Sequence, residues 1–151
     1  MEKRYYLAYG SNLNVSQMKY RCPDAKIVGT AVIKGYELLY KGSKTGAYLT
    51  IEKRKGGRVP VAVWEVSQAD EGRLDIYEGF PVFYYKKELR LPVQTKKDKK
   101  KLDTFVYIMD EKRCRALPHW TYVKVCKEGY EFFGFDKKYL DEAYERSMRR
   151  E

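Results

Sequence analysis

The order of hydrophobic patterns along the 151 residues is the feature that most restricts the fold. From residue 4 to residue 109, apolar and aromatic residues occur in short, partly alternating runs that are typical of β-strands. From residue 118 to residue 147 they recur at helical spacing. Because a chain of this length supports one hydrophobic core, residues 1–151 are predicted to form a single α+β domain with mostly antiparallel strands first and helices last.

Turn and capping residues divide these patterns into individual elements. Gly56-Gly57 in the basic tract 53–58 predicts a hairpin, and the lysine-rich tract 96–101 predicts a solvated loop. We expect helices at residues 14–21 (capped at Asn12 or Asn14), 67–77, 118–133 and 136–147. We expect strands at 4–8, 25–40 (two strands, broken near Lys34-Gly35), 47–52, 59–66, 84–93 and 103–109.

Composition excludes several classes of protein. A 15% aromatic content argues against intrinsic disorder despite a net charge of +10. No apolar run approaches the ~20 residues that cross a bilayer, and the N-terminal apolar stretch is too short for a secretory signal. We therefore expect a cytoplasmic protein with no membrane association.

The three cysteines and the single histidine point away from metal chemistry. Cys22, Cys114 and Cys126 form no CxxC pair, and with His119 alone they do not make up the usual four-ligand zinc site. We interpret them as free thiols in a reducing compartment and expect no metal or cofactor. His119, next to Pro118, is interpreted as a helix-start residue.

A polar turn follows the first strand. The segment YGSNL (9–13) joins an apolar strand to a short helix, so its backbone N–H groups are predicted to point outward and to suit a bound carboxylate or oxyanion. Gly10 lets a ligand approach the backbone closely. A plain β-to-α turn with an asparagine cap accounts equally well for the same residues.

A second segment, LDIYEGFP (74–81), places a glutamate at a predicted helix end. Glu78 is flanked by Tyr77, Phe80 and Phe83, so partial removal of water is expected to raise its pKa toward the range useful for proton transfer. The negative end of the helix acts in the same direction. The alternative is that Glu78 faces solvent and Gly79 merely ends the helix.

In combination, the segments YLAYGSNL, LDIYEGFPVFYYKKEL and FVYIMD resemble the γ-glutamylcyclotransferase-like family, which includes the plant AIG2-like proteins. The resemblance runs from Tyr5 to about Met109, and residues 118–139 are similar to the family's C-terminal helix. It implies a small mixed α/β structure around a barrel-like sheet. It also implies an enzyme that releases 5-oxoproline when the substrate's own α-amine attacks its γ-carbonyl.

The resemblance also implies site residues. The family's catalytic carboxylate corresponds to Glu78, with Glu88 as an alternative that lacks the Glu-Gly context. Two tyrosines of later strands correspond best to Tyr84, with its neighbour Tyr85 left open, and to Tyr107. The turn that holds the glutamyl group corresponds to Tyr9, Gly10, Ser11, Asn12 and Leu13.

The chemistry agrees with these roles. The attacking amine is an ammonium at neutral pH, so it must first lose a proton, and Glu78 can accept that proton and return it to the leaving amine. Because both reacting groups belong to one molecule, holding the substrate in a ring-forming pose is a large part of catalysis. Glutathione, γ-glutamyl amino acids and γ-glutamyl amines all stay open as substrates; residues 41–46 are expected to shape the leaving-group side.

Two other functions compete with this interpretation. The basic tracts 53–58 and 96–101, with Arg146, Arg149 and Arg150, fit a nucleic-acid-binding module whose loops straddle a phosphate backbone. The chain carries no signature of a known nucleic-acid-binding motif, which weighs against that function. The second competing function is that of a protein of the same fold that binds a γ-glutamyl ligand without turnover. Whether the protein forms a homodimer is left open.

Overall fold

The computed structural model describes residues 3–43 and 46–149. The chain combines a sheet with α-helices, two of which lie between strands and two of which follow the last strand, and this confirms the α+β class. The elements are β1 Arg4–Ala8, the 3-10 helix η1 Ser11–Leu13, α1 Val15–Arg21, β2 Lys26–Ser43, β3 Gly46–Val66, α2 Gln68–Glu78, β4 Tyr84–Gln94, β5 Lys99–Met109, β6 Cys114–Arg115, α3 Trp120–Phe133 and α4 Lys138–Met148.

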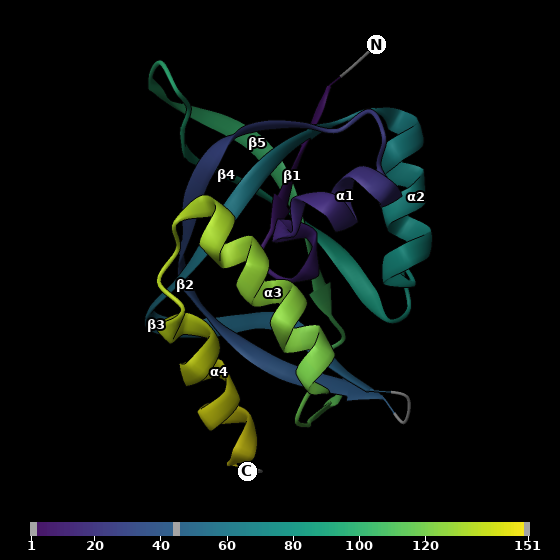
Figure 1. The fold of residues 1–151 in the computed structure, drawn as a ribbon, viewed down its shortest axis with the longest axis vertical. Helices are drawn as coiled ribbons and strands as arrows, with labels where there is room; N and C mark the ends of the chain where they lie inside the picture. The colour runs from purple at the N-terminus through teal and green to yellow at the C-terminus, as the bar shows by residue number, and fades with distance from the viewer. Residues whose placement is uncertain (1–2, 44–45, 150–151) are drawn as a thin grey trace.

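The strands close into a mixed barrel. Hydrogen bonding follows the order β3-β1-β5-β4-β2, and β2 pairs with β3 to complete the ring. The β1–β5 pair is parallel, and the other pairs of this ring are antiparallel. Figure 1 shows α1 and α2 together on one side of the barrel, with α3 and α4 crossing another side. A barrel removes the exposed sheet edges that an open sheet would leave.

The barrel interior and the faces under the helices form one core. Its largest fully buried side chains include Trp64, Tyr40 and Phe105. Tyr6 of β1 stacks on Phe105 of β5, with 5.6 Å between ring centroids. Many of the aromatic residues, which make up 15% of the chain, therefore lie in this core, and they position the strand ends from which the site is built.

The predicted strand breaks in the region 25–66 are wrong. β2 is continuous through Gly35, and β3 is continuous through the basic tract 53–58, so Gly56-Gly57 marks no hairpin. The register passes from Lys34 opposite Arg58 to Tyr36 opposite Lys53, which leaves residues 54–57 facing Gly35. Gly35 and Gly56 have φ of 82° and 80°. The glycines therefore mark an irregularity in one long two-stranded ribbon, where positive φ favours glycine.

The loop predicted at 96–101 is shorter than expected. β4 ends at Gln94 and β5 begins at Lys99, so Lys99–Lys101 belong to a strand. The turn between the strands is closed by a hydrogen bond from Thr95 N–H to the Asp98 carbonyl at 2.8 Å. A lysine run on the exposed end of a hairpin keeps its charges in water and still pairs through its backbone.

Helix ends agree better with the sequence. Ser67 accepts a hydrogen bond from Asp70 N–H, and Asn14 accepts one from Gln17 N–H, as expected of N-caps. His119 caps α3 by accepting from Thr121 N–H, which confirms it as a helix-start residue. Gly134 ends α3 with φ of 73°.

Three further observations bear on the excluded classes. Cys22 and Cys126 are free and buried, and Cys114 is free and exposed. Within residues 3–43 and 46–149, no helix is long and apolar enough to cross a membrane. In the same part of the chain, no group of three or more His, Cys, Asp or Glu side chains is placed so that it could hold a metal ion.

Candidate active site

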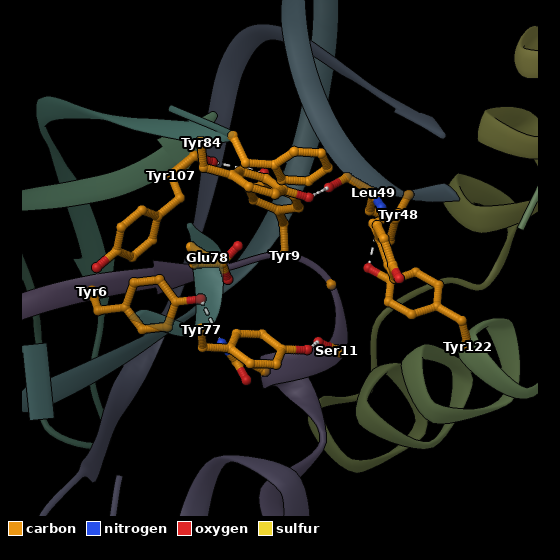
Figure 2. Close-up of a pocket in the computed structure, with 13 residues that line it drawn as sticks. Tyr6, Tyr9, Ser11, Tyr48, Leu49, Tyr77, Glu78, Tyr84, Tyr107 and Tyr122 are labelled. Atoms are coloured by element: carbon orange, nitrogen blue, oxygen red, sulfur yellow. Dashed lines mark hydrogen bonds between the residues drawn. The ribbon is translucent and has the colours of Figure 1, made fainter. Parts of the chain in front are cut away.

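The strand directions bring several chemically useful residues to one end of the barrel. β1 and β5 are parallel, so their carboxyl ends lie at the same end, together with the amino ends of the antiparallel β3 and β4. A cavity of about 220 Å³ lies there (Figure 2). It is lined by Tyr6, Tyr9, Gly10, Ser11, Asn12, Tyr48, Leu49, Tyr77, Glu78, Phe83, Tyr84, Tyr107 and Tyr122.

The turn after β1 forms one wall of this cavity. Tyr9 is buried and donates a hydrogen bond from its hydroxyl to the Tyr107 carbonyl at 2.7 Å. Among the described residues, the N–H groups of Gly10, Ser11 and Asn12 have no hydrogen-bond partner. A Cβ on Gly10 would lie 3.2 Å from the Tyr122 hydroxyl, so glycine permits this close packing. The residues of this wall therefore carry amide donors that no other described group occupies.

A buried polar chain supports the turn from behind. The Asn12 side chain donates to the Tyr6 hydroxyl at 2.9 Å and accepts from Arg21 at 2.5 Å. The Arg21 guanidinium lies 3.7 Å from the centre of the Tyr77 ring. Asn12 is therefore a bridge between a positive charge on α1 and a tyrosine of the cavity wall, which explains a buried asparagine at this position.

Glu78 occupies the last position of α2, and its carboxylate lies among the tyrosines of the cavity (Figure 2). Gly79, with φ of 65°, ends the helix in the left-handed conformation. In the described part of the chain, this carboxylate has neither a hydrogen-bond partner nor an ion pair. Removal of water raises the pKa of Glu78 from its usual 4.5 to about 8, and the positive charge of Arg21 opposes that rise.

Asp75, one turn earlier on the same helix, attaches α2 to the barrel. It accepts a hydrogen bond from the Tyr107 hydroxyl at 2.5 Å, and Lys86 of β4 lies 2.8 Å from the same oxygen. Lys86 also pairs with Glu71 of α2 at 2.6 Å. These contacts fix the end of α2 against β4 and β5, and with it the position of Glu78 over the cavity.

The choice between the two adjacent tyrosines of β4 has a clear geometric answer. Tyr84 lines the cavity, and its hydroxyl donates to the Leu49 carbonyl at 2.9 Å. Tyr85 points away from the cavity and bonds to the Glu111 carboxylate. Alternation along a strand requires this opposite orientation, so only one of the pair can face the site.

Two predicted residues lie outside the cavity. Leu13 is fully buried but is not a lining residue; its Cβ lies 2.5 Å from the point that a Cβ on Gly129 would occupy. Glu88, the alternative carboxylate, is 77% exposed and pairs with Arg4 on the barrel surface. In the predicted tract 41–46, Lys41 is buried and paired with Glu52, and residues 44–45 lie outside the described residues.

Sequence reasoning missed several lining residues, namely Tyr6, Tyr48, Leu49, Tyr77, Phe83 and Tyr122. Tyr77 and Phe83 were noted only as neighbours of Glu78. Tyr6 precedes the YGSN turn on the same strand, so strand alternation offered a signal for it. Tyr48 and Tyr122 come from β3 and α3, and no local pattern connects them with the site.

The basic tracts do not form the single surface that a nucleic-acid module needs. Residues 54–58, Arg146 and Arg149 line one cleft between β3 and α4, but three glutamates line it too. The tract 96–101 lies in the β4–β5 hairpin, far from the end of α4 (Figure 1). The tract 53–58 lies within β3 and forms no hairpin loop, so the alternative of two loops on one end of a sheet does not match the structure; Arg150 lies outside the described residues.

Solved structures resemble this one closely. A structure titled "Gamma-glutamyl cyclotransferase" is 26% identical, with a TM-score of 0.80, and the match covers 99% of this chain and 89% of that one. An uncharacterized human protein is 25% identical, with a TM-score of 0.77 and coverage of 100% and 89%. A yeast γ-glutamyl cyclotransferase described as specific to glutathione, 14% identical with a TM-score of 0.67 and coverage of 99% and 97%, shares the fold.

Comparison of the sequence itself gives two results. A search of curated proteins finds no match. A family model described as "Gamma-glutamyl cyclotransferase, AIG2-like" matches residues 6–124, a range that includes the turn after β1, Glu78 and both of the predicted strand tyrosines. The chain therefore belongs to the γ-glutamyl cyclotransferase, AIG2-like family.

Proposed function

We propose that this protein is a γ-glutamyl cyclotransferase that releases 5-oxoproline from a γ-glutamyl amine or peptide, with Glu78 as general acid and base. One observation carries the proposal. Among the described residues, Glu78 is the only carboxylate that lines the cavity, and it has a pKa of about 8. A group with this pKa holds and releases a proton near neutral pH.

The proton transfers follow from this pKa. Glu78 takes a proton from the substrate's α-ammonium, and the freed amine attacks the γ-carbonyl carbon to form the five-membered ring. The C–N bond to the leaving group then breaks as the same carboxyl group returns its proton to the departing nitrogen. The ring nitrogen also gives up its second proton, which the released amine takes up to become an ammonium. Two protons thus pass from the attacking nitrogen to the leaving nitrogen, and none is gained or lost overall.

The cavity walls support the binding side of the reaction. The free N–H groups of Gly10, Ser11 and Asn12 suit the substrate's carboxylate or the oxyanion that develops on the γ-carbonyl oxygen. Tyr84 and Tyr107 are in contact with the same space. A small cavity that holds both ends of the glutamyl chain favours the folded, ring-forming pose.

The test is release of 5-oxoproline from a panel of γ-glutamyl amines and peptides by the wild-type protein and by Glu78→Gln. We expect the variant to lose about 10²- to 10⁴-fold in kcat, the usual contribution of general acid–base catalysis. Glu88→Gln makes the same change on the exposed surface of β4 and is the matched control. Circular dichroism checks that both variants are folded.

The pH dependence provides a second readout. Glu78 can accept the proton of the α-ammonium only when it is itself ionised. Since its pKa is about 8, kcat/KM is expected to rise with pH up to about 8. Full turnover by Glu78→Gln, or no 5-oxoproline from any substrate with wild-type protein, would contradict the proposal. Binding of these ligands without turnover would instead favour the non-catalytic alternative.

A further inference from the structure

We infer that the leaving-group side of the cavity is an aromatic rim, formed by Tyr48, Phe83 and Tyr122, which selects γ-glutamyl amino acids with large apolar or aromatic side chains. The inference rests on the proposed function and goes beyond it, since it names the part of the substrate that the reaction itself leaves undefined. Three independent observations carry it: the gradient of burial, the contacts between the rings, and the distribution of charge.

The cavity has a buried inner part and a partly exposed opening. Tyr6, Tyr9 and Tyr84 are each less than a tenth exposed and lie deep in the cavity. The three rim residues are partly exposed, and so are Ser11 and Glu78, so both groups lie where the cavity meets solvent. The glutamyl group has to reach the turn amides and Glu78, so the aromatic residues are the part of this opening that is left for the leaving group.

The rim is a continuous aromatic surface. The Tyr48 ring makes edge contacts with Tyr122 at 5.3 Å and with Phe83 at 6.4 Å between centroids. Tyr122 is held in place because its hydroxyl accepts a hydrogen bond from Leu49 N–H at 3.1 Å. Figure 2 shows Tyr48 and Tyr122 across the open space from Tyr6 and Tyr107. Such a wall binds an apolar side chain or a ring far better than a hydrated polar chain.

One positive charge lies beside the rim. The Arg113 guanidinium lies 4.3 Å from the centre of the Phe83 ring. Within the part of the chain that the structure describes, Arg113 has no carboxylate partner. A leaving group with a carboxylate is therefore favoured at this mouth, and one with a second ammonium is disfavoured.

The matched test compares γ-glutamyl-phenylalanine with γ-glutamyl-glycine, which differ only in the side chain that would contact the rim. Since burial of a large apolar side chain contributes about 1.5–3 kcal/mol, we expect wild-type kcat/KM to be roughly 10- to 100-fold higher for the phenylalanine substrate. Tyr48→Ala is expected to reduce this ratio to about 3 or less. Tyr20→Ala, at a position that is 90% exposed on α1, is expected to leave the ratio unchanged.

A second pair tests the charge. γ-Glutamyl-butylamide and γ-glutamyl-(4-aminobutyl)amide differ by one terminal ammonium. We expect kcat/KM to be about 3- to 10-fold lower for the substrate with the ammonium than for the butylamide. Arg113→Gln is expected to reduce this difference in kcat/KM. Because each result is a ratio between two substrates on the same protein, a general loss of stability in a variant cancels out. Phe83→Leu offers a milder change of the rim should Tyr48→Ala fail to fold, with an intermediate ratio expected.

The outcomes separate this inference from the proposed function. Turnover of all substrates with a phenylalanine-to-glycine ratio near one, or a ratio that survives in both rim variants, overturns the aromatic rim alone. Preference for the ammonium-bearing substrate overturns it as well. Absence of 5-oxoproline from every substrate overturns the proposed function and this inference with it.

Discussion

At the scale of single residues, the environment of Glu78 determines what the cavity can do. Burial of its carboxylate raises the pKa to about 8, and the nearby positive charge of Arg21 opposes only part of that rise. The result is a carboxyl group that is mostly protonated at neutral pH. Such a group is costly to ionise in the folded protein, and that cost links the proposed chemistry to stability.

Glu78 is therefore expected to lower stability as pH rises. Its folded pKa of about 8 lies above the usual 4.5, so between these values the folded protein holds the proton more tightly than the unfolded chain does. Its favourable contribution is complete below about pH 4.5 and is lost as pH rises through 8. We expect Glu78→Gln to be close to wild type in Tm at pH 5 and higher by on the order of 5 °C at pH 9.

Thermal unfolding followed by circular dichroism at the two pH values measures this difference. Glu88→Gln serves again as control, because it makes the same substitution at an exposed position of β4. A Glu78→Gln variant that is equally stable at pH 5 and pH 9 relative to wild type would show that Glu78 titrates normally and faces water.

Site residues were predictable where the chemistry is local. Tyr9–Asn12 stand out because a strand, a polar turn and a helix start follow one another directly, and Glu78 stands out because it ends a helix among aromatic residues. Tyr48 and Tyr122 were not predictable, because each is one aromatic residue among many in its element. Only the closed barrel brings them to the site.

At the scale of elements, capping residues gave reliable boundaries and strand breaks did not. Asn14, Ser67 and His119 each cap a helix by accepting a hydrogen bond from an N–H group two or three residues later. Both partners are therefore close together in the sequence, which makes the helix start predictable. The ends of β2 and β3 depend instead on pairing between the two strands. Gly56-Gly57 is compatible with either a hairpin or an irregular ribbon, and the partner strand decides between them.

The contact between α3 and the turn after β1 is expected to matter for the site. A Cβ on Gly129 would lie 2.5 Å from both the carbonyl carbon and the Cβ of Leu13, so Gly129→Ala must displace the turn or the helix. We expect a loss of about 1–3 kcal/mol in unfolding free energy. We also expect a lower kcat/KM, because the amide wall of the cavity moves with Leu13.

Gly72→Ala is the matched control, since it makes the same substitution in helix α2 with open space around the position. There alanine should raise the unfolding free energy by about 0.5–1 kcal/mol. Urea denaturation and 5-oxoproline release measure both effects. Equal stability and activity for the two variants would show that the turn does not rest on α3 in the way described.

At the scale of the whole molecule, closure of the barrel is the feature that sequence patterns did not contain. The family resemblance implied a barrel-like sheet, but strand order and register are long-range properties. β2 reaches β4 through the single pair Thr30 and Gln94, next to Gly29. A Cβ on Gly29 would lie 2.0 Å from the Gln94 carbonyl oxygen, so the two strands approach closely only because a glycine stands there.

Gly29→Ala is therefore expected to weaken the closure of the barrel. The added methyl group meets backbone atoms rather than a flexible side chain, so we expect a loss of about 1–3 kcal/mol or more in unfolding free energy. The midpoint of urea denaturation reports it. A midpoint equal to that of wild type would mean that β2 and β4 are farther apart than described.

A crystal structure of Glu78→Gln with an uncleaved γ-glutamyl substrate is the most direct test of the whole account. We predict that the glutamyl group lies inside the barrel cavity, with its α-amine within hydrogen-bond distance of the residue-78 side chain. Its carboxylate or γ-carbonyl oxygen should accept hydrogen bonds from the amides of residues 10–12. Substrate bound at another surface, or with its amine turned away from residue 78, would contradict the account.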